Sequence, residues 1–145
     1  MNLRAVNILL VDDSPADAEL TLFTLKRIGF CNPVHHELHA DAALAWLEAT
    51  PTLPDLILLD INMPGMSGLE FLGVIKAQDR YAPIPVVVFT SSGRRGDIEE
   101  AYRNHCAGYI KKPLDVAELG EALSGLGRYW FALVERPRSS DTPAQ

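Results

Sequence analysis

The stretch LILLDINMPGMSGLEFL, at 56–72, decides the fold of this chain. Its first four residues form an apolar run typical of a strand buried on both faces, and the run ends at one acidic residue, Asp60. A loop with Pro64, Gly65 and Gly68 follows, after which apolar residues recur at helical spacing. The pattern predicts a strand, a loop and a helix, with a lone carboxylate where the strand ends.

The same alternation of apolar runs and helical segments continues along the chain. Together with 56–60, strands are expected at 7–11, 34–38, 84–90 and 108–112. Helices are expected at 15–28, capped by Ser14, and at 41–48, capped by Asp41, then at 67–80, at 97–104 and from 115 onwards. Alternating strands and helices predict an α/β fold with a parallel sheet and helices on both faces. Right-handed crossovers then bring the carboxyl ends of the strands to one edge, where a site is expected.

Length and composition favour one globular domain. The 145 residues are 48% hydrophobic and 22% charged, enough for one core and too few for two. A formal net charge of −6 argues against a nucleic-acid binder. No apolar run has the length of a membrane span, and the N-terminus lacks the cleavage site of a signal peptide. Cys31 and Cys106 form no CxxC motif and are expected to be reduced thiols of a cytoplasmic protein.

Polar side chains stand at the ends of four predicted strands. Asp12 and Asp13 follow the first strand, and Asp60, Thr90 and Lys112 end the third, fourth and fifth. Crowded carboxylates repel one another unless a cation is present, and Mg²⁺ prefers such oxygen ligands. A lysine can hold one oxygen of a phosphoryl group, and a hydroxyl can donate to another. The set predicts phosphoryl transfer with Asp60 as the nucleophile.

Four motifs together resemble the response-regulator receiver domain of two-component signalling. They are VDDSP, LLDINMPGMSGLE, VVVFTSS and YIKKP, and the resemblance covers 6–126. Thr90 lies thirty positions after Asp60, and Lys112 lies twenty-two after Thr90, in agreement with the family. The resemblance implies a single doubly wound (βα)5 domain of the flavodoxin-like, CheY-like kind, with a five-stranded parallel sheet in the order 2-1-3-4-5.

The resemblance also implies a phosphoacceptor and a metal site. Asp60 would accept a phosphoryl group from a phosphohistidine of a sensor histidine kinase. Asp13, Asp60 and the backbone carbonyl of Asn62 would ligate Mg²⁺, while Asp12 would act largely through a bound water. The protein would then be no enzyme in the ordinary sense, since it would catalyse only its own phosphorylation and dephosphorylation.

Further residues are implied to bind the phosphoryl group and to respond to it. Lys112 would pair with that group, its peptide to the following proline being cis, and the small Ser91 would leave room for the group. Thr90 and Tyr109 would form the switch pair, the hydroxyl moving in and the ring turning inward behind it. Asn62 and Ser92 occupy the family positions that tune hydrolysis of the acyl phosphate.

The C-terminal part predicts self-association. A receiver domain with an extended last helix is expected over 1–135, and a disordered tail over 136–145. An apolar stripe continues along that helix, so a homodimer is expected through Leu126, Trp130 and Phe131, on the side of the fourth and fifth strands. The segment YWFALVERP resembles stand-alone regulators of bacterial phytochrome kinases, so a bacteriophytochrome is a candidate kinase. No effector domain is expected, and output would pass through protein contacts.

Three other functions remain open, and one histidine cluster has a plain interpretation. A phosphohydrolase of the haloacid-dehalogenase type also uses an aspartyl nucleophile, but it needs a second acid where Asn62 stands. A pseudo-receiver would be an interaction module without phosphorylation, and a flavin-binding flavodoxin needs a phosphate cradle where the first loop has acids. His35, His36 and His39 do not share one strand face and are expected to form a solvated cluster near the sheet edge.

Overall fold

The computed structural model describes residues 6–30 and 34–129. Five strands alternate with five helices: β1 (Ile8–Val11), α1 (Pro15–Arg27), β2 (His35–Glu37), α2 (Ala40–Ala49), β3 (Leu56–Leu59), α3 (Gly68–Lys76), β4 (Val86–Thr90), α4 (Arg95–Arg103), β5 (Gly108–Lys111) and α5 (Val116–Gly127). Within the described ranges, none of the helices combines the length and hydropathy that a membrane span requires. The expected α/β alternation is confirmed.

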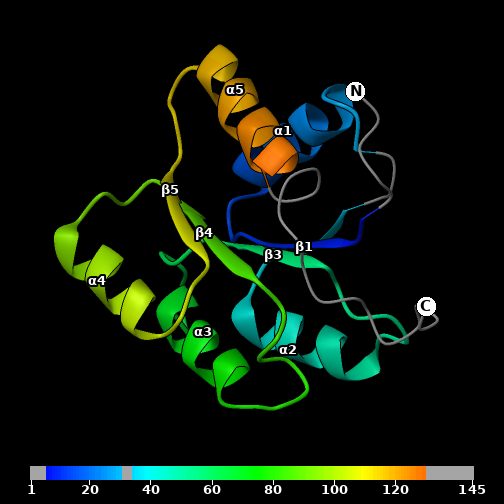
Figure 1. The fold of residues 1–145 in the computed structure, drawn as a ribbon, viewed down its shortest axis with the longest axis vertical. Helices are drawn as coiled ribbons and strands as arrows, with labels where there is room; N and C mark the ends of the chain where they lie inside the picture. The colour runs from blue at the N-terminus through cyan, green and yellow to red at the C-terminus, as the bar shows by residue number, and fades with distance from the viewer. Residues whose placement is uncertain (1–5, 31–33, 130–145) are drawn as a thin grey trace.

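The strands form one parallel sheet in the order β2-β1-β3-β4-β5, as expected. Helices α1 and α5 cover one face of this sheet, and α2, α3 and α4 cover the other (Figure 1). The chain runs from β1 to the edge strand β2 and then returns to β3 on the other side of β1, so β1 and β3 are neighbours. This neighbour relation brings the ends of strands far apart in sequence to one place.

Each central strand contributes to two separate cores because successive side chains point to opposite faces. In β3, Ile57 and Leu59 pack towards α2, α3 and α4, whereas Leu56 and Leu58 pack towards α1 and α5. All four are fully buried, which explains why this strand has no polar position until Asp60. The continuous apolar run therefore reflects burial on both faces.

Side-chain caps set the beginnings of α1, α3 and α5. The Ser14 hydroxyl accepts a hydrogen bond from the Asp17 N–H and caps α1, as expected. Ser67 and Glu70 form a capping box at the start of α3. Asp115 caps α5 by accepting from two backbone N–H groups. These caps fix where the helices leave the loops that surround the site.

Two expected helix starts are wrong. Helix α2 has His39 as its N-cap residue, while Asp41 lies inside the first turn, where its charge favours the positive end of the helix. Helix α4 begins at Arg95 rather than at residue 97. The Ser92 hydroxyl accepts a hydrogen bond from the Arg94 N–H and ends the loop there.

Candidate functional site

The polar strand ends meet at the carboxyl edge of the sheet because the backbone holds the strands in register. The Asp60 N–H donates to the Val11 carbonyl over 2.9 Å, so Asp60 lies beside Asp12. The Lys112 N–H donates to the Thr90 carbonyl over 2.7 Å, so Lys112 lies beside the end of β4. The expected gathering of acids, hydroxyl and lysine is therefore observed.

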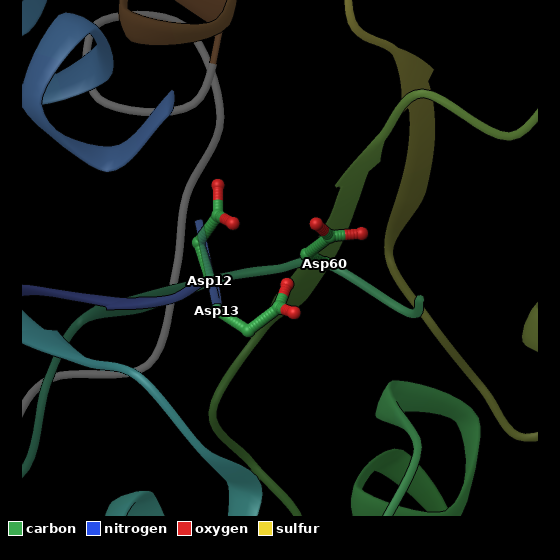
Figure 2. A group of neighbouring side chains, drawn as sticks. All are labelled: Asp12, Asp13 and Asp60. Atoms are coloured by element: carbon green, nitrogen blue, oxygen red, sulfur yellow. The ribbon is translucent and has the colours of Figure 1, made fainter. Parts of the chain in front are cut away.

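Asp12, Asp13 and Asp60 form an acidic cluster (Figure 2), in which one carboxylate oxygen from each lies within 4.8 Å of the others. The Asp13 side chain extends from the end of β1 towards Asp60 (Figure 2). Asp12 is 0% exposed and Asp60 is 8% exposed, so little water can screen their repulsion. Three closely spaced carboxylates are the oxygen donor set of a hard divalent cation, and the cluster therefore fits such an ion.

Asp12 is a buried acid whose hydrogen bonds are satisfied by the protein. Its two oxygens accept from the Ser14 N–H at 3.0 Å and from the Lys112 ammonium at 2.8 Å. Burial raises the pKa of Asp12, and the charge of Asp60 adds to this, against the opposing hydrogen bonds from Lys112 and Ser14. The metal-free site thus resists carrying all of its negative charge.

Lys112 faces the cluster from the end of β5. Its ammonium lies 2.8 Å from Asp12, 3.5 Å from Asp60 and 3.5 Å from Asp17. Burial works to lower the pKa of Lys112, but the hydrogen bond to Asp12 and the nearby acids together raise it, so the ammonium stays charged. The peptide from Lys112 to Pro113 is trans, and the expected cis peptide is wrong. A trans bond is the more stable form before proline, and the lysine reaches the acids from it.

Thr90 and Tyr109 form two successive contacts leading away from Asp60. The Thr90 hydroxyl is fully buried and donates to Asp60 Oδ1 over 2.7 Å. The Tyr109 hydroxyl donates to the Ser92 carbonyl over 2.9 Å, and its ring packs on the core beneath α4. The Ser92 hydroxyl itself donates to Asp97 over 2.6 Å. The Ser92 N–H donates to the Thr90 hydroxyl over 3.4 Å, so the two residues expected as a switch pair both contact Ser92 in the β4–α4 loop.

Of the remaining expected residues, two lie at the site, one packs on a core, and the others lie outside the described residues. The Asn62 N–H donates to Asp60 Oδ1 at 3.2 Å, and Ser91 is exposed at the end of β4. Leu126 is half-buried and packs on the core shared by α1 and α5. Trp130 and Phe131, like the expected tail at 136–145, lie outside the described residues.

Two further residues contact the site, although the sequence pattern does not single them out as site residues. One is Asp17, in the first turn of α1, which begins close after the acidic pair and so borders the site; its carboxylate lies 3.5 Å from the Lys112 ammonium. His36 was placed in a solvated cluster, yet its ring Nε2 lies 2.8 Å from the Asp12 carbonyl oxygen. Nothing in the sequence pattern indicates that second contact, because it depends on the pairing of β2 with β1.

The contribution of Asp12 to the stability of the metal-free protein should fall as pH rises above the ordinary aspartate range. Because the pKa of Asp12 is raised, the folded state holds that proton more tightly than the unfolded chain. A bound cation needs the deprotonated acids, so the rise in melting temperature caused by Mg²⁺ over EDTA should be larger at about pH 8 than at about pH 5. Calorimetric melting with Mg²⁺ and with EDTA at both pH values measures this difference. An equal rise in melting temperature at the two pH values would contradict the prediction.

The fold and the site together define a phosphoacceptor domain of two-component signalling. The chain belongs to the response regulator receiver domain family, whose model matches residues 8–124. It is 36% identical over 140 residues to response regulator Rcp1 of Synechocystis sp., a match that covers 90% of this chain and 92% of the relative. The phosphorylated cyanobacterial phytochrome response regulator RcpA has a TM-score of 0.87 at 31% identity, covering 93% of this chain and 100% of that one.

Two further solved structures are similar. The Mn²⁺-bound form of Rcp1 has a TM-score of 0.83 at 34% identity and covers 92% of this chain and 99% of that chain. The bacteriophytochrome response regulator AtBRR has a TM-score of 0.72 at 34% identity and covers 91% and 99%. The chain is therefore a receiver domain for two-component signalling that resembles phytochrome-associated regulators.

Proposed function

We propose that this receiver takes a phosphoryl group from the phosphohistidine of a sensor histidine kinase onto Asp60, with Mg²⁺ in the acidic cluster. The observation that carries the proposal is the gathering of three carboxylates within 4.8 Å, a lysine ammonium 3.5 Å from Asp60 and a hydroxyl 2.7 Å from it. Asp13, Asp60 and the Asn62 carbonyl would hold the ion, with Asp12 acting through a water. Bound Mg²⁺ would supply positive charge against the carboxylates and the phosphoryl oxygens.

The chemistry requires one carboxylate nucleophile and donors for the phosphoryl oxygens. A carboxylate oxygen of Asp60 forms the new P–O bond while the P–N bond to the kinase histidine breaks, and the leaving nitrogen keeps the electron pair. Lys112 already carries its proton beside Asp60 and can move its ammonium from the acids to a phosphoryl oxygen. The exposed Ser91 leaves space at the mouth of the site. The products are an acyl phosphate on this chain and a free histidine on the kinase.

The signal is proposed to leave the site through Thr90 and Tyr109. The Thr90 hydroxyl exchanges its bond with Asp60 for one with a phosphoryl oxygen, and Tyr109 packs inward behind it. Its hydrogen bond to the Ser92 carbonyl couples this movement to the β4–α4 loop. The acyl phosphate would later be hydrolysed, at a rate set at Asn62 and Ser92, and the chain would catalyse no other reaction.

Phosphorylation by a small donor tests the proposed function directly. Acetyl phosphate with Mg²⁺ should add the mass of one phosphoryl group to the intact protein, and EDTA should prevent the addition, because the repelling acids then have no cation. Intact-mass spectrometry gives the readout. Repeated turnover of a phosphate ester would instead favour the phosphohydrolase, and a failure to bind Mg²⁺ near millimolar concentration would favour the pseudo-receiver.

The partner is proposed to be a kinase of the bacteriophytochrome kind, in the cytoplasm. The proposal is supported by the likeness to RcpA and to AtBRR, whose names associate them with phytochromes. Phosphotransfer profiling against a panel of histidine kinases, one of them a red-light photoreceptor, tests it. Transfer to this chain from the other kinases alone would remove the phytochrome assignment.

The receiver, proposed to extend over 1–135, is expected to form a homodimer through the last helix and the side of β4 and β5. Trp130→Ala should lower the mass in light scattering from that of a dimer to that of a monomer, because an aromatic anchor of the interface is lost. Phe23→Ala, which removes an exposed aromatic side chain from α1, is the matched control and should leave the mass unchanged. An unchanged mass for Trp130→Ala would show that this segment is no interface.

A further inference from the structure

His36 connects the edge strand β2 to the backbone of the acidic loop. Its ring Nε2 lies 2.8 Å from the Asp12 carbonyl oxygen, and the side chain is half-buried. A carbonyl oxygen can only accept, so Nε2 carries a proton and donates. The backbone N–H of Asp12 is also bonded to β2, since it donates to the Glu37 carbonyl over 3.1 Å.

The His36 contact holds the peptide that leads from Asp12 to Asp13, and the Glu37 contact holds the peptide before it, so both sides of Asp12 are bonded to β2. Because a peptide group is planar, holding its carbonyl oxygen also sets the direction in which Asp13 leaves the strand. Asp12 itself is further held by Ser14 and Lys112 through its carboxylate. Among the described residues, by contrast, no hydrogen bond holds the Asp13 carboxylate. The orientation of Asp13 towards Asp60 (Figure 2) therefore depends on the backbone.

We propose that His36 is a positioning residue for the divalent-cation site, which aims Asp13 by holding the Asp12–Asp13 peptide. The inference rests on the proposed function, because it concerns the ion that the acidic cluster would bind. His36 does not touch the ion or the phosphoryl group. It acts by keeping the acidic loop in the shape that the ligands need before the ion arrives.

Magnesium affinity, measured by titration calorimetry on the full chain, separates this role from a general contribution to folding. His36→Phe keeps a flat ring but removes the donor, and it should weaken Mg²⁺ binding about tenfold, the usual order for an outer-shell partner. His36→Gln returns an amide donor of similar reach and should bind within about twofold of the wild type, whereas the shorter His36→Asn should not recover. Urea unfolding of each variant gives the stability in parallel.

His35→Phe is the matched control for the change on the same strand. His35 lies on the opposite face of β2 from His36. Its ring stacks on Trp46 with 4.2 Å between the ring centroids, and it also contacts the Glu37 carboxylate, so this variant should keep wild-type Mg²⁺ affinity. Wild-type affinity in His36→Phe, or equal losses in His36→Gln and His36→Asn, would overturn the inference while leaving the proposed function standing. A wild-type protein that binds no Mg²⁺ would overturn both. If His36→Phe does not fold, the comparison of the two amide variants decides.

Discussion

Asp60→Asn should reduce phosphorylation by acetyl phosphate to background, with the fold retained. The amide that replaces the carboxylate has no charge and is a poor nucleophile, so the P–O bond cannot form. The amide oxygen can still accept from the Thr90 hydroxyl and the Asn62 N–H, both of which donate to Asp60 Oδ1 in the wild type. Removal of one of three mutually repelling acids should also leave the metal-free protein at least as stable. Intact mass after incubation with the donor and Mg²⁺ measures the effect.

Asp55→Asn is the matched control for this result. Asp55 lies at the opposite end of β3, where its carboxylate accepts from the Asn7 N–H over 2.9 Å, and an amide oxygen can keep that bond. This variant should therefore gain one phosphoryl mass like the wild type. If Asp60→Asn is labelled as fully as Asp55→Asn, the nucleophile is another residue and the proposed site is wrong.

Gly68→Ala should destabilise the protein by about 3 kcal/mol or more, because the first turn of α3 has no room for a methyl group. A Cβ at this position would lie 2.3 Å from the Asp60 carbonyl oxygen and 2.5 Å from the Ile61 Cα. Both are backbone atoms and cannot rotate away. The helix or the phosphoacceptor loop must therefore shift, and the Gly68 N–H would lose its 3.1 Å bond to the Ile61 carbonyl.

Gly73→Ala makes the same change in the same helix with the opposite expected sign. The nearest atom to a Cβ there is the Asn104 side-chain oxygen at 3.7 Å, an ordinary contact. Alanine is the better helix former, so this variant should gain about 0.5–1 kcal/mol. Urea midpoints report both changes, and labelling by acetyl phosphate shows whether Gly68→Ala also disturbs Asp60. Equal stabilities of the two variants would show that the close approach at Gly68 does not exist.

The strand ends were predictable because burial on both faces leaves a clear trace in the sequence. The run before Asp60 is apolar wherever helices bury both faces of the strand, and the first polar residue marks the end of the strand at the edge of the sheet. The same reasoning placed Thr90 and Lys112 at the edge of the sheet. Helix starts were less predictable, as His39 and Arg94 show, because a cap residue can act through extended backbone without any side-chain bond.

The sequence by itself determined the α/β class, the strand ends and the kinds of chemical group that stand there, since burial and charge act locally along the chain. Only the tertiary structure decided which groups touch. Lys112 and Asp12 are 100 positions apart, and His36 and Asp12 are 24 apart, yet each pair is in contact across the sheet. Such contacts follow from the order of strands and the packing of helices, and residue spacing along one segment carries no trace of either.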